Sequence, residues 1–172
     1  METQTRTIAA PGCTVTYDVR RNEDSGEPPL MLIGSPMGAS GFRALADDFP
    51  ERTVITYDPR GDERSIKDDP SSLSNPNQHA DDLHRIIQEV GGPVDMFASS
   101  GGAVNALALV ATHPDDVRIL VAHEPPLAAL LPDVLQVRAE LADMNDRYQQ
   151  ALMDFWTAQA DYDLATGEEG RR

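Results

Sequence analysis

One short stretch of the chain combines a serine with the small residues that a catalytic turn requires. Ser100 comes after a predicted strand, residues 94–98, and Ser99, and is followed directly by two glycines and an apolar run. Ala98 lies two residues before the serine and Gly102 two residues after it, which is the spacing of a nucleophile elbow. Small side chains at these two positions let the strand and the helix approach each other. The pattern predicts acyl-transfer chemistry with Ser100 as the nucleophile.

The residues after Ser100 favour the same chemistry. A helix that begins at this turn offers free backbone N–H groups and the positive end of its dipole to a developing oxyanion. The N–H of Gly101 is the donor expected there. The alternative interpretation is a plain glycine-rich turn that binds phosphate, but the chain has neither the dinucleotide glycine pattern nor a Walker pattern.

The elements that must position this serine alternate between strands and helices. Short β-branched or apolar runs predict strands, and apolar residues at a period near 3.6 predict helices. The expected strands span 6–9, 14–20, 30–33, 53–57, 94–98 and 118–122, and the expected helices span 42–48, 77–90 and 103–111. Residues 61–75 are expected to form a surface loop. The fold class predicted is α/β, a mostly parallel sheet with helices on both faces.

After residue 126 the pattern is helical only. We therefore expect an incomplete sheet domain over 1–126 and a helical lid over 127–172. Apolar residues at helical spacing in the lid would line an apolar acyl pocket or pack the lid itself; they are Met144, Tyr148, Leu152, Phe155 and Trp156.

Composition limits the partners. The 172 residues include 29 acidic and 14 basic ones, for a formal net charge of −15, which repels nucleic acid and anionic membranes. No apolar run approaches the length of a membrane span. A single cysteine, Cys13, and an N-terminus without a signal-peptide pattern indicate a cytoplasmic protein. The sequence shows no cysteine–histidine cluster and no phosphate loop, so we expect no metal and no cofactor.

Further motifs accompany the elbow. Gly-Ser-Pro-Met-Gly at 34–38 follows the predicted strand 30–33, Asp-Pro-Arg-Gly at 58–61 follows the next strand, and His-Pro-Asp-Asp at 113–116 follows the elbow helix. In this order and spacing, the chain resembles the α/β-hydrolase family from about residue 5 to about residue 165. The resemblance implies cofactor-free hydrolysis of a small apolar ester or a related acyl substrate.

The resemblance also implies roles for individual residues. The backbone N–H of Ser35 becomes the second oxyanion donor beside that of Gly101, since Pro36 has no N–H. Asp58 and Arg60 are implied to brace loops near the site. Two departures from the family pattern are Ile33, which replaces a histidine, and a glutamate at position 63, which replaces a glycine.

A serine hydrolase also needs a histidine to take the serine's proton and a carboxylate to orient that histidine. His79 and His84 are expected to be solvated on their helix, and His113 to be a cation at a helix end. His123 ends a predicted strand on the same sheet edge as the serine and is the only histidine placed to act as the base. Glu124 would be the acid or a support for the turn that follows it.

In the family the acid and the histidine follow the lid, and no histidine follows residue 123 here. We therefore expect a chain that stops within the lid and is weakly active or inactive by itself. The alternative is a non-catalytic truncated remnant that acts as a binding or assembly module. Without a further strand, Ile119, Leu120 and Val121 would lie on an exposed sheet edge, which favours a homodimer.

Overall fold

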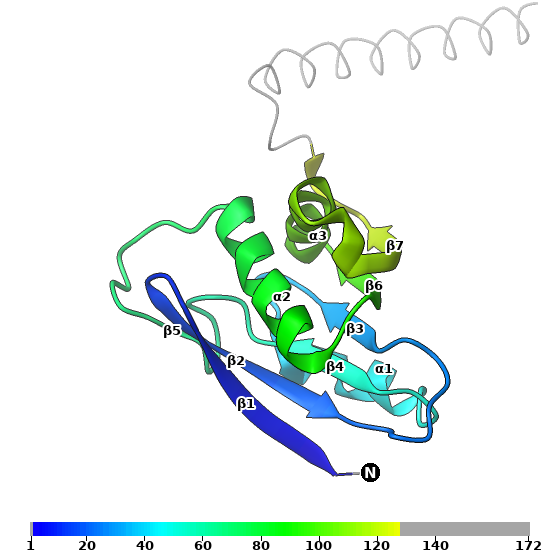
Figure 1. Cartoon of the computed structure of the whole chain (residues 1–172). Coiled ribbons are helices and arrows are strands. Elements are labelled where there is room, and N and C mark those ends of the chain that lie inside the picture. The colour runs from blue at the N-terminus through cyan, green and yellow to red at the C-terminus, as the bar shows by residue number, and fades with distance from the viewer. Residues whose placement is uncertain (1, 128–172) are drawn as a thin grey trace, which may run out of the picture. The chain divides into compact units, whose positions relative to one another are not determined.

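The computed structural model describes residues 2–127, and seven strands in this part of the chain form one sheet (Figure 1). The strands are β1 Thr3–Ala10, β2 Cys13–Arg20, β3 Leu30–Ile33, β4 Val54–Tyr57, β5 Ile66–Lys67, β6 Val94–Ser99 and β7 Val117–His123. The helices are α1 Arg43–Asp47, α2 Pro76–Val90 and α3 Gly101–Thr112, with 3-10 turns η1 Ala39–Phe42 and η2 Pro114–Asp116. The chain divides into units 1–126 and 127–172. The predicted helical lid, apart from Leu127, and its five candidate pocket residues lie outside the described residues.

The order of strands in the sheet is β1-β2-β4-β3-β6-β7, with β5 beside β2. β3 pairs in parallel with both β4 and β6, and β6 pairs in parallel with β7, whereas β2 is antiparallel to its neighbours. The predicted α/β fold with a mostly parallel sheet core is confirmed. Because β3, β6 and β7 run in one direction, the loops after them meet at one edge of the sheet.

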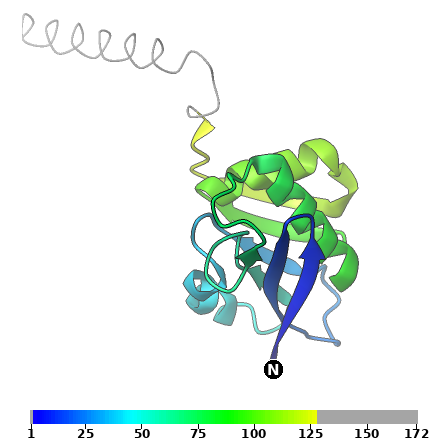
Figure 2. The same cartoon turned by 90° about the vertical axis from the view of Figure 1, so that its left-hand side faces the viewer.

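Two apolar clusters cover the two faces of the sheet. Side chains of α2 and α3 pack with alternate residues of the strands, among them Met31, Ile55 and Met96. The other face packs against η1 and α1 through Leu30, Leu32 and neighbouring residues. Figure 2 shows the cyan segment of α1 and the green helices on opposite sides of the sheet.

The predicted elements and the structure differ at a few boundaries. β5 lies inside the predicted loop 61–75; two residues are too short a strand to leave a pattern. α2 begins at Pro76 because Asn75 caps it: the Asn75 side chain accepts a hydrogen bond from the Gln78 N–H, and the Gln78 side chain accepts one from the Asn75 N–H. α3 begins at Gly101, two residues earlier than predicted.

β7 forms one edge of the sheet. Within residues 2–127 it pairs only with β6, and the side chains of Ile119 and Val121 are about half exposed, at 51% and 53%. None of the helices in this part of the chain is long and apolar enough to cross a membrane.

Candidate active site

Ser100 occupies a sharp turn between β6 and α3. Its backbone angles are φ 54° and ψ −125°, a conformation that residues with a side chain rarely adopt. The Ser100 N–H donates to the His123 carbonyl at 2.9 Å, and the Ser100 carbonyl accepts from the Ala103 N–H at 3.0 Å. Such strain costs about 1–3 kcal/mol and persists only where the surroundings hold it. The predicted strand–serine–helix turn is therefore present, and its backbone is strained at the serine itself.

Two glycines let the loop after β3 lie against this turn. A Cβ atom at Gly102 would lie 2.7 Å from the Cα atom of Gly34, and a Cβ atom at Gly101 would lie 2.8 Å from the carbonyl oxygen of Ser35. Gly102 thus makes room for the backbone of the β3 loop, not only for its own strand as the sequence pattern suggested. The structure brings Ser35 and Gly101 together, and within residues 2–127 neither backbone N–H has a hydrogen-bond acceptor.

Asp58, which follows β4, holds the loop after β3 in place through a hydrogen bond. Its carboxylate accepts hydrogen bonds from the Ala39 N–H at 2.9 Å and from Nε of Arg64 at 2.5 Å. Gly38 lies so close that a Cβ atom there would be 2.7 Å from Oδ1 of Asp58. Asp58 therefore has the bracing geometry that the resemblance implied.

Arg60 lies in the turn after β4, as Asp58 does, and anchors that turn to α2. Its Nε donates to Oδ2 of Asp82 at 2.8 Å and its Nη2 donates to Oδ1 at 2.6 Å, a bidentate pair. The two side chains are only 4% and 0% exposed. A buried, fully paired guanidinium contributes to loop geometry and is not available to a substrate.

His123 contacts the neighbour of the candidate nucleophile. Its Nδ1 lies 3.4 Å from Oγ of Ser99, its register partner in the β6–β7 pair. Within residues 2–127 no histidine side chain is hydrogen-bonded to Ser100. The next residue, Glu124, has a φ of 48°, a second strained position at this sheet edge.

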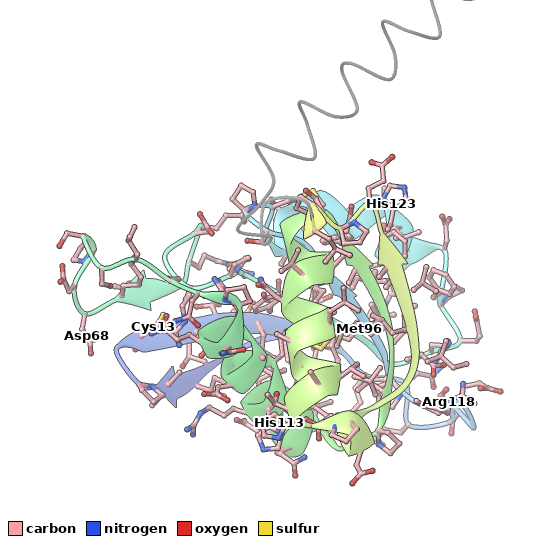
Figure 3. The ribbon with its side chains drawn as sticks, turned by 90° about the horizontal axis from the view of Figure 1, so that it is seen from above. Cys13, Asp68, Met96, His113, Arg118 and His123 are labelled. Carbon is pink, nitrogen blue, oxygen red and sulfur yellow. The ribbon has the colours of Figure 1, made fainter. Side chains whose placement is uncertain are left out.

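The other histidines lie away from Ser100, and two of them differ from expectation. His79 is buried, not solvated, and burial lowers its pKa to about 4, so the ring is neutral at physiological pH. His84 is partly buried against Asp116, with Nδ1 2.6 Å from Oδ2. His113 lies at the end of α3, and Figure 3 shows it at the opposite end of the molecule from His123.

Two hollows of the described residues lie elsewhere. One, of about 690 Å³, is formed by β1 and α2, and the other, of about 400 Å³, lies beside β1, β2 and α1. Ser100 lines neither. The candidate site thus rests on backbone geometry.

Comparison with known proteins gives a consistent family. The sequence model of the alpha/beta hydrolase fold matches residues 28–166. The chain is 35% identical over 127 residues to YraK, an uncharacterized hydrolase of Bacillus subtilis. That match covers 73% of this chain and 46% of the relative, so the chain spans about half the length of the curated relative it matches.

Solved structures resemble the fold. The epoxide hydrolase CorEH matches with a TM-score of 0.59 and 23% identity, over 69% of this chain and 41% of that one. A point mutant of the haloalkane dehalogenase DatA from Agrobacterium tumefaciens matches with a TM-score of 0.59 and 19% identity, over 72% and 42%. At these identities the likeness concerns the fold alone.

Proposed function

The chain belongs to the α/β-hydrolase fold family, and on that premise we propose that it carries the nucleophile and oxyanion-binding part of a serine hydrolase. The substrate class proposed is a small apolar ester or a related acyl compound. The observation that carries the proposal is the strained backbone of Ser100, held at the start of α3 against the Gly34–Ser35 backbone.

The proposed chemistry begins with attack of the Ser100 hydroxyl oxygen on the ester carbonyl carbon. The carbonyl oxygen becomes an oxyanion, and the backbone N–H groups of Ser35 and Gly101 donate to it. One such donor contributes roughly 3–4 kcal/mol to the transition state of an acyl transfer. The alcohol leaves, the acyl group stays on Ser100 as an ester, and water then releases the acid. These steps need no cofactor.

The hydroxyl must also lose its proton, and this step separates two versions of the proposal. Within residues 2–127 the histidine nearest to the turn is His123, and its ring contacts Ser99 instead of Ser100. Loss of a catalytic histidine costs on the order of a million-fold in turnover in a well-studied serine protease. We therefore propose that residues 2–127 by themselves acylate slowly and that full turnover needs a base from elsewhere.

The same observation favours a second candidate function. With an intact elbow and no histidine hydrogen-bonded to Ser100 within residues 2–127, this part of the chain would bind an acyl ligand, or assemble with another chain, without turnover. Net charge and the single cysteine continue to favour a cytoplasmic protein that binds neither nucleic acid nor membrane.

The test is covalent labelling with a fluorophosphonate probe, followed by peptide mapping, together with hydrolysis of p-nitrophenyl acetate. Wild type is expected to be labelled at Ser100, and Ser100→Ala is expected to lose the label. The matched control is Ser99→Ala, which removes the neighbouring hydroxyl and should keep the label. Equal labelling of Ser100→Ala and wild type would refute the nucleophile assignment.

Two further results distinguish a chain that acylates from one that only binds. Loss of labelling in His123→Ala, with an unchanged circular dichroism spectrum, would identify His123 as the base. A folded wild type that resists the probe would exclude acylation and favour the non-catalytic alternative.

A further inference from the structure

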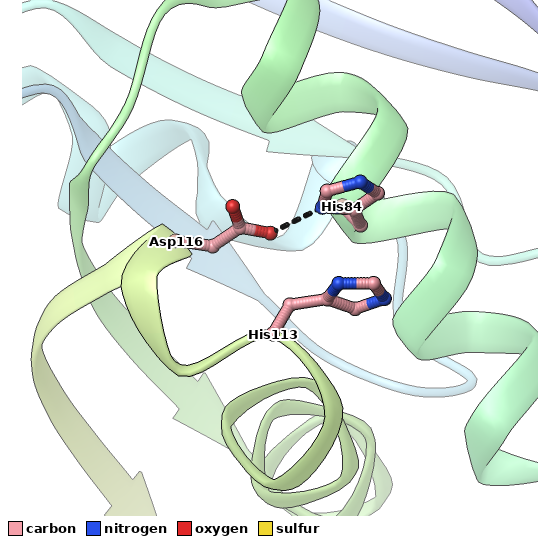
Figure 4. Close-up of side chains that lie close together, drawn as sticks. All are labelled: His84, His113 and Asp116. Carbon is pink, nitrogen blue, oxygen red and sulfur yellow. Dashed lines mark hydrogen bonds and ion pairs between the residues drawn. The ribbon is translucent and has the colours of Figure 1, made fainter.

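Three potential metal ligands meet at the end of the sheet opposite to Ser100. His84 lies on α2, His113 ends α3, and Asp116 lies in η2, directly before the first residue of β7 (Figure 4). One ligand atom from each residue lies within 4.8 Å of the others. The elbow follows the last residue of β6 and contacts the last residue of β7, so this cluster is separate from the proposed hydrolase site and goes beyond it.

The ligand atoms lie close together, but those of His84 and Asp116 are closer to each other than two ligands of one metal ion would be. Nδ1 of His84 lies 2.6 Å from Oδ2 of Asp116. Ligands around a tetrahedral zinc ion are about 3.4 Å apart, given metal–ligand bonds of about 2.0–2.2 Å. An ion that replaces the shared proton therefore needs the two groups to separate by somewhat less than an ångström. His84 is one-third exposed, at 33%, which leaves it room to do so.

The second histidine is already placed beside the first. The rings of His84 and His113 are stacked with centroids 3.9 Å apart and planes 10° apart. Nε2 of His113 faces Oδ1 of Asp81 at 3.7 Å, which leaves Nδ1 for a metal. Ligating histidines typically donate their other N–H to a carboxylate. The His113 side chain is 30% exposed, and its ring must turn out of the stack for Nδ1 to point at an ion shared with His84.

The carboxylate is the fixed member of the cluster. Asp116 is buried, and its second oxygen accepts a hydrogen bond from Nε2 of Gln88 at 3.0 Å. This contact orients the carboxylate in the way that outer-shell partners orient metal ligands. Solvent reaches the cluster from the side of the β1–α2 hollow, which His84 and Gln88 help to line.

We propose that His84, His113 and Asp116 bind one divalent transition-metal ion, with zinc as the probe of choice. Two imidazoles and one carboxylate suit zinc, cobalt and nickel better than magnesium or calcium, which prefer oxygen ligands. Because the three ligands come from α2, the end of α3 and η2, one bound ion would hold α2 against the connection between α3 and β7. A fourth position remains for water.

The experiment is isothermal titration of the metal-free chain with ZnCl2, with visible absorption of bound Co2+ as a second readout. Wild type is expected to bind one equivalent, and its melting temperature is expected to rise with zinc. His84→Gln and His113→Gln are each expected to weaken binding about tenfold or more, because each removes one of the three ligands.

The controls are matched to the ligands. Asp115→Asn removes the exposed carboxylate next to Asp116 and should bind zinc like wild type, whereas Asp116→Asn should not. His123→Gln tests a histidine outside the cluster and should also bind like wild type. If either histidine variant unfolds, the visible spectrum of Co2+ bound to wild type still shows whether histidines bind the ion, because imidazole ligands change that spectrum. Absence of saturable binding by wild type, or equal binding by wild type and folded His113→Gln, would overturn the proposal.

Discussion

Replacement of Arg60 by methionine is expected to destabilise the protein in a pH-dependent way. The Arg60 side chain is 4% exposed, and within residues 2–127 the carboxylate that accepts its hydrogen bonds is that of Asp82, which is fully buried. Burial raises the pKa of Asp82, and the two hydrogen bonds from Arg60 oppose that rise. Arg60→Met removes both hydrogen bonds and leaves burial as the largest influence on this carboxyl group, so the carboxylate must remain charged without a hydrogen-bonded partner or take up a proton.

The magnitude follows from the cheaper of these two outcomes. A buried charge that loses its partner typically costs about 3–5 kcal/mol. Protonation of a carboxyl group with an ordinary pKa near 3.9 costs about 4 kcal/mol at pH 7 and about 1.5 kcal/mol at pH 5. In the variant the folded state therefore holds a proton that the unfolded state releases. Its stability relative to wild type must rise as the pH falls from 7 to 5.

The measurement is urea unfolding followed by circular dichroism at both pH values. We expect a loss of about 3–5 kcal/mol at pH 7 that shrinks by about 2 kcal/mol at pH 5. Arg85→Met, on the exposed face of α2, is the matched control and should change stability by less than about 0.5 kcal/mol. The double variant Arg60→Met with Asp82→Leu should recover most of the loss, since it leaves no buried charge. A loss at pH 7 below about 1 kcal/mol, or a loss equal at both pH values, would refute this account of the pair.

Four further outcomes are expected. Ser100→Gly should gain about 1 kcal/mol of stability, because glycine adopts the strained turn at less cost, and should lose fluorophosphonate labelling. Gly102→Ala should lose about 1–3 kcal/mol through its contact with the β3 loop and should label more slowly than wild type. The pKa of buried His79 is lowered to about 4, so between pH 6.5 and pH 4 only the unfolded state takes up a proton on this ring. The free energy of unfolding of wild type should therefore fall by about 3 kcal/mol over this range on account of His79. Urea unfolding of His79→Leu should lack this contribution. We propose that the exposed edge of β7 pairs two chains, so Val121→Lys should shift sedimentation toward monomer; a wild type that sediments as a monomer at every concentration would contradict this.

The fold and the serine turn could be predicted because both leave local patterns. The run 30–33 is continuously apolar because both faces of the strand are covered, and 94–98 is apolar except for Asp95. The alternation of such strands with helical periods indicates the fold class. The small residues around Ser100 mark the turn because a side chain there meets backbone.

Long-range contacts were not predictable in the same way. His79 and His84 occupy one helix and have no pattern that separates a buried ring from a solvated one. His84 and Asp116 are 32 residues apart in sequence. They meet only because α2 packs beside α3 and the short turn that follows it. The pairing of His123 with Ser99 depends on the register of two parallel strands, and a shift of one residue would have aimed the ring at the other face.

The strain at Ser100 supports the proposal that this turn is catalytic. A structural strand-to-helix turn with a positive φ favours glycine, and two glycines follow immediately at 101 and 102. The chain nevertheless places a side chain at the strained position and uses its glycines to bring the β3 loop into contact. Asp58 fixes that loop through the hydrogen bond from the Ala39 N–H, and Arg60 anchors the turn after β4 to α2. The tolerated strain has no benefit for folding, so it favours the interpretation that the hydroxyl of Ser100 is what this arrangement presents.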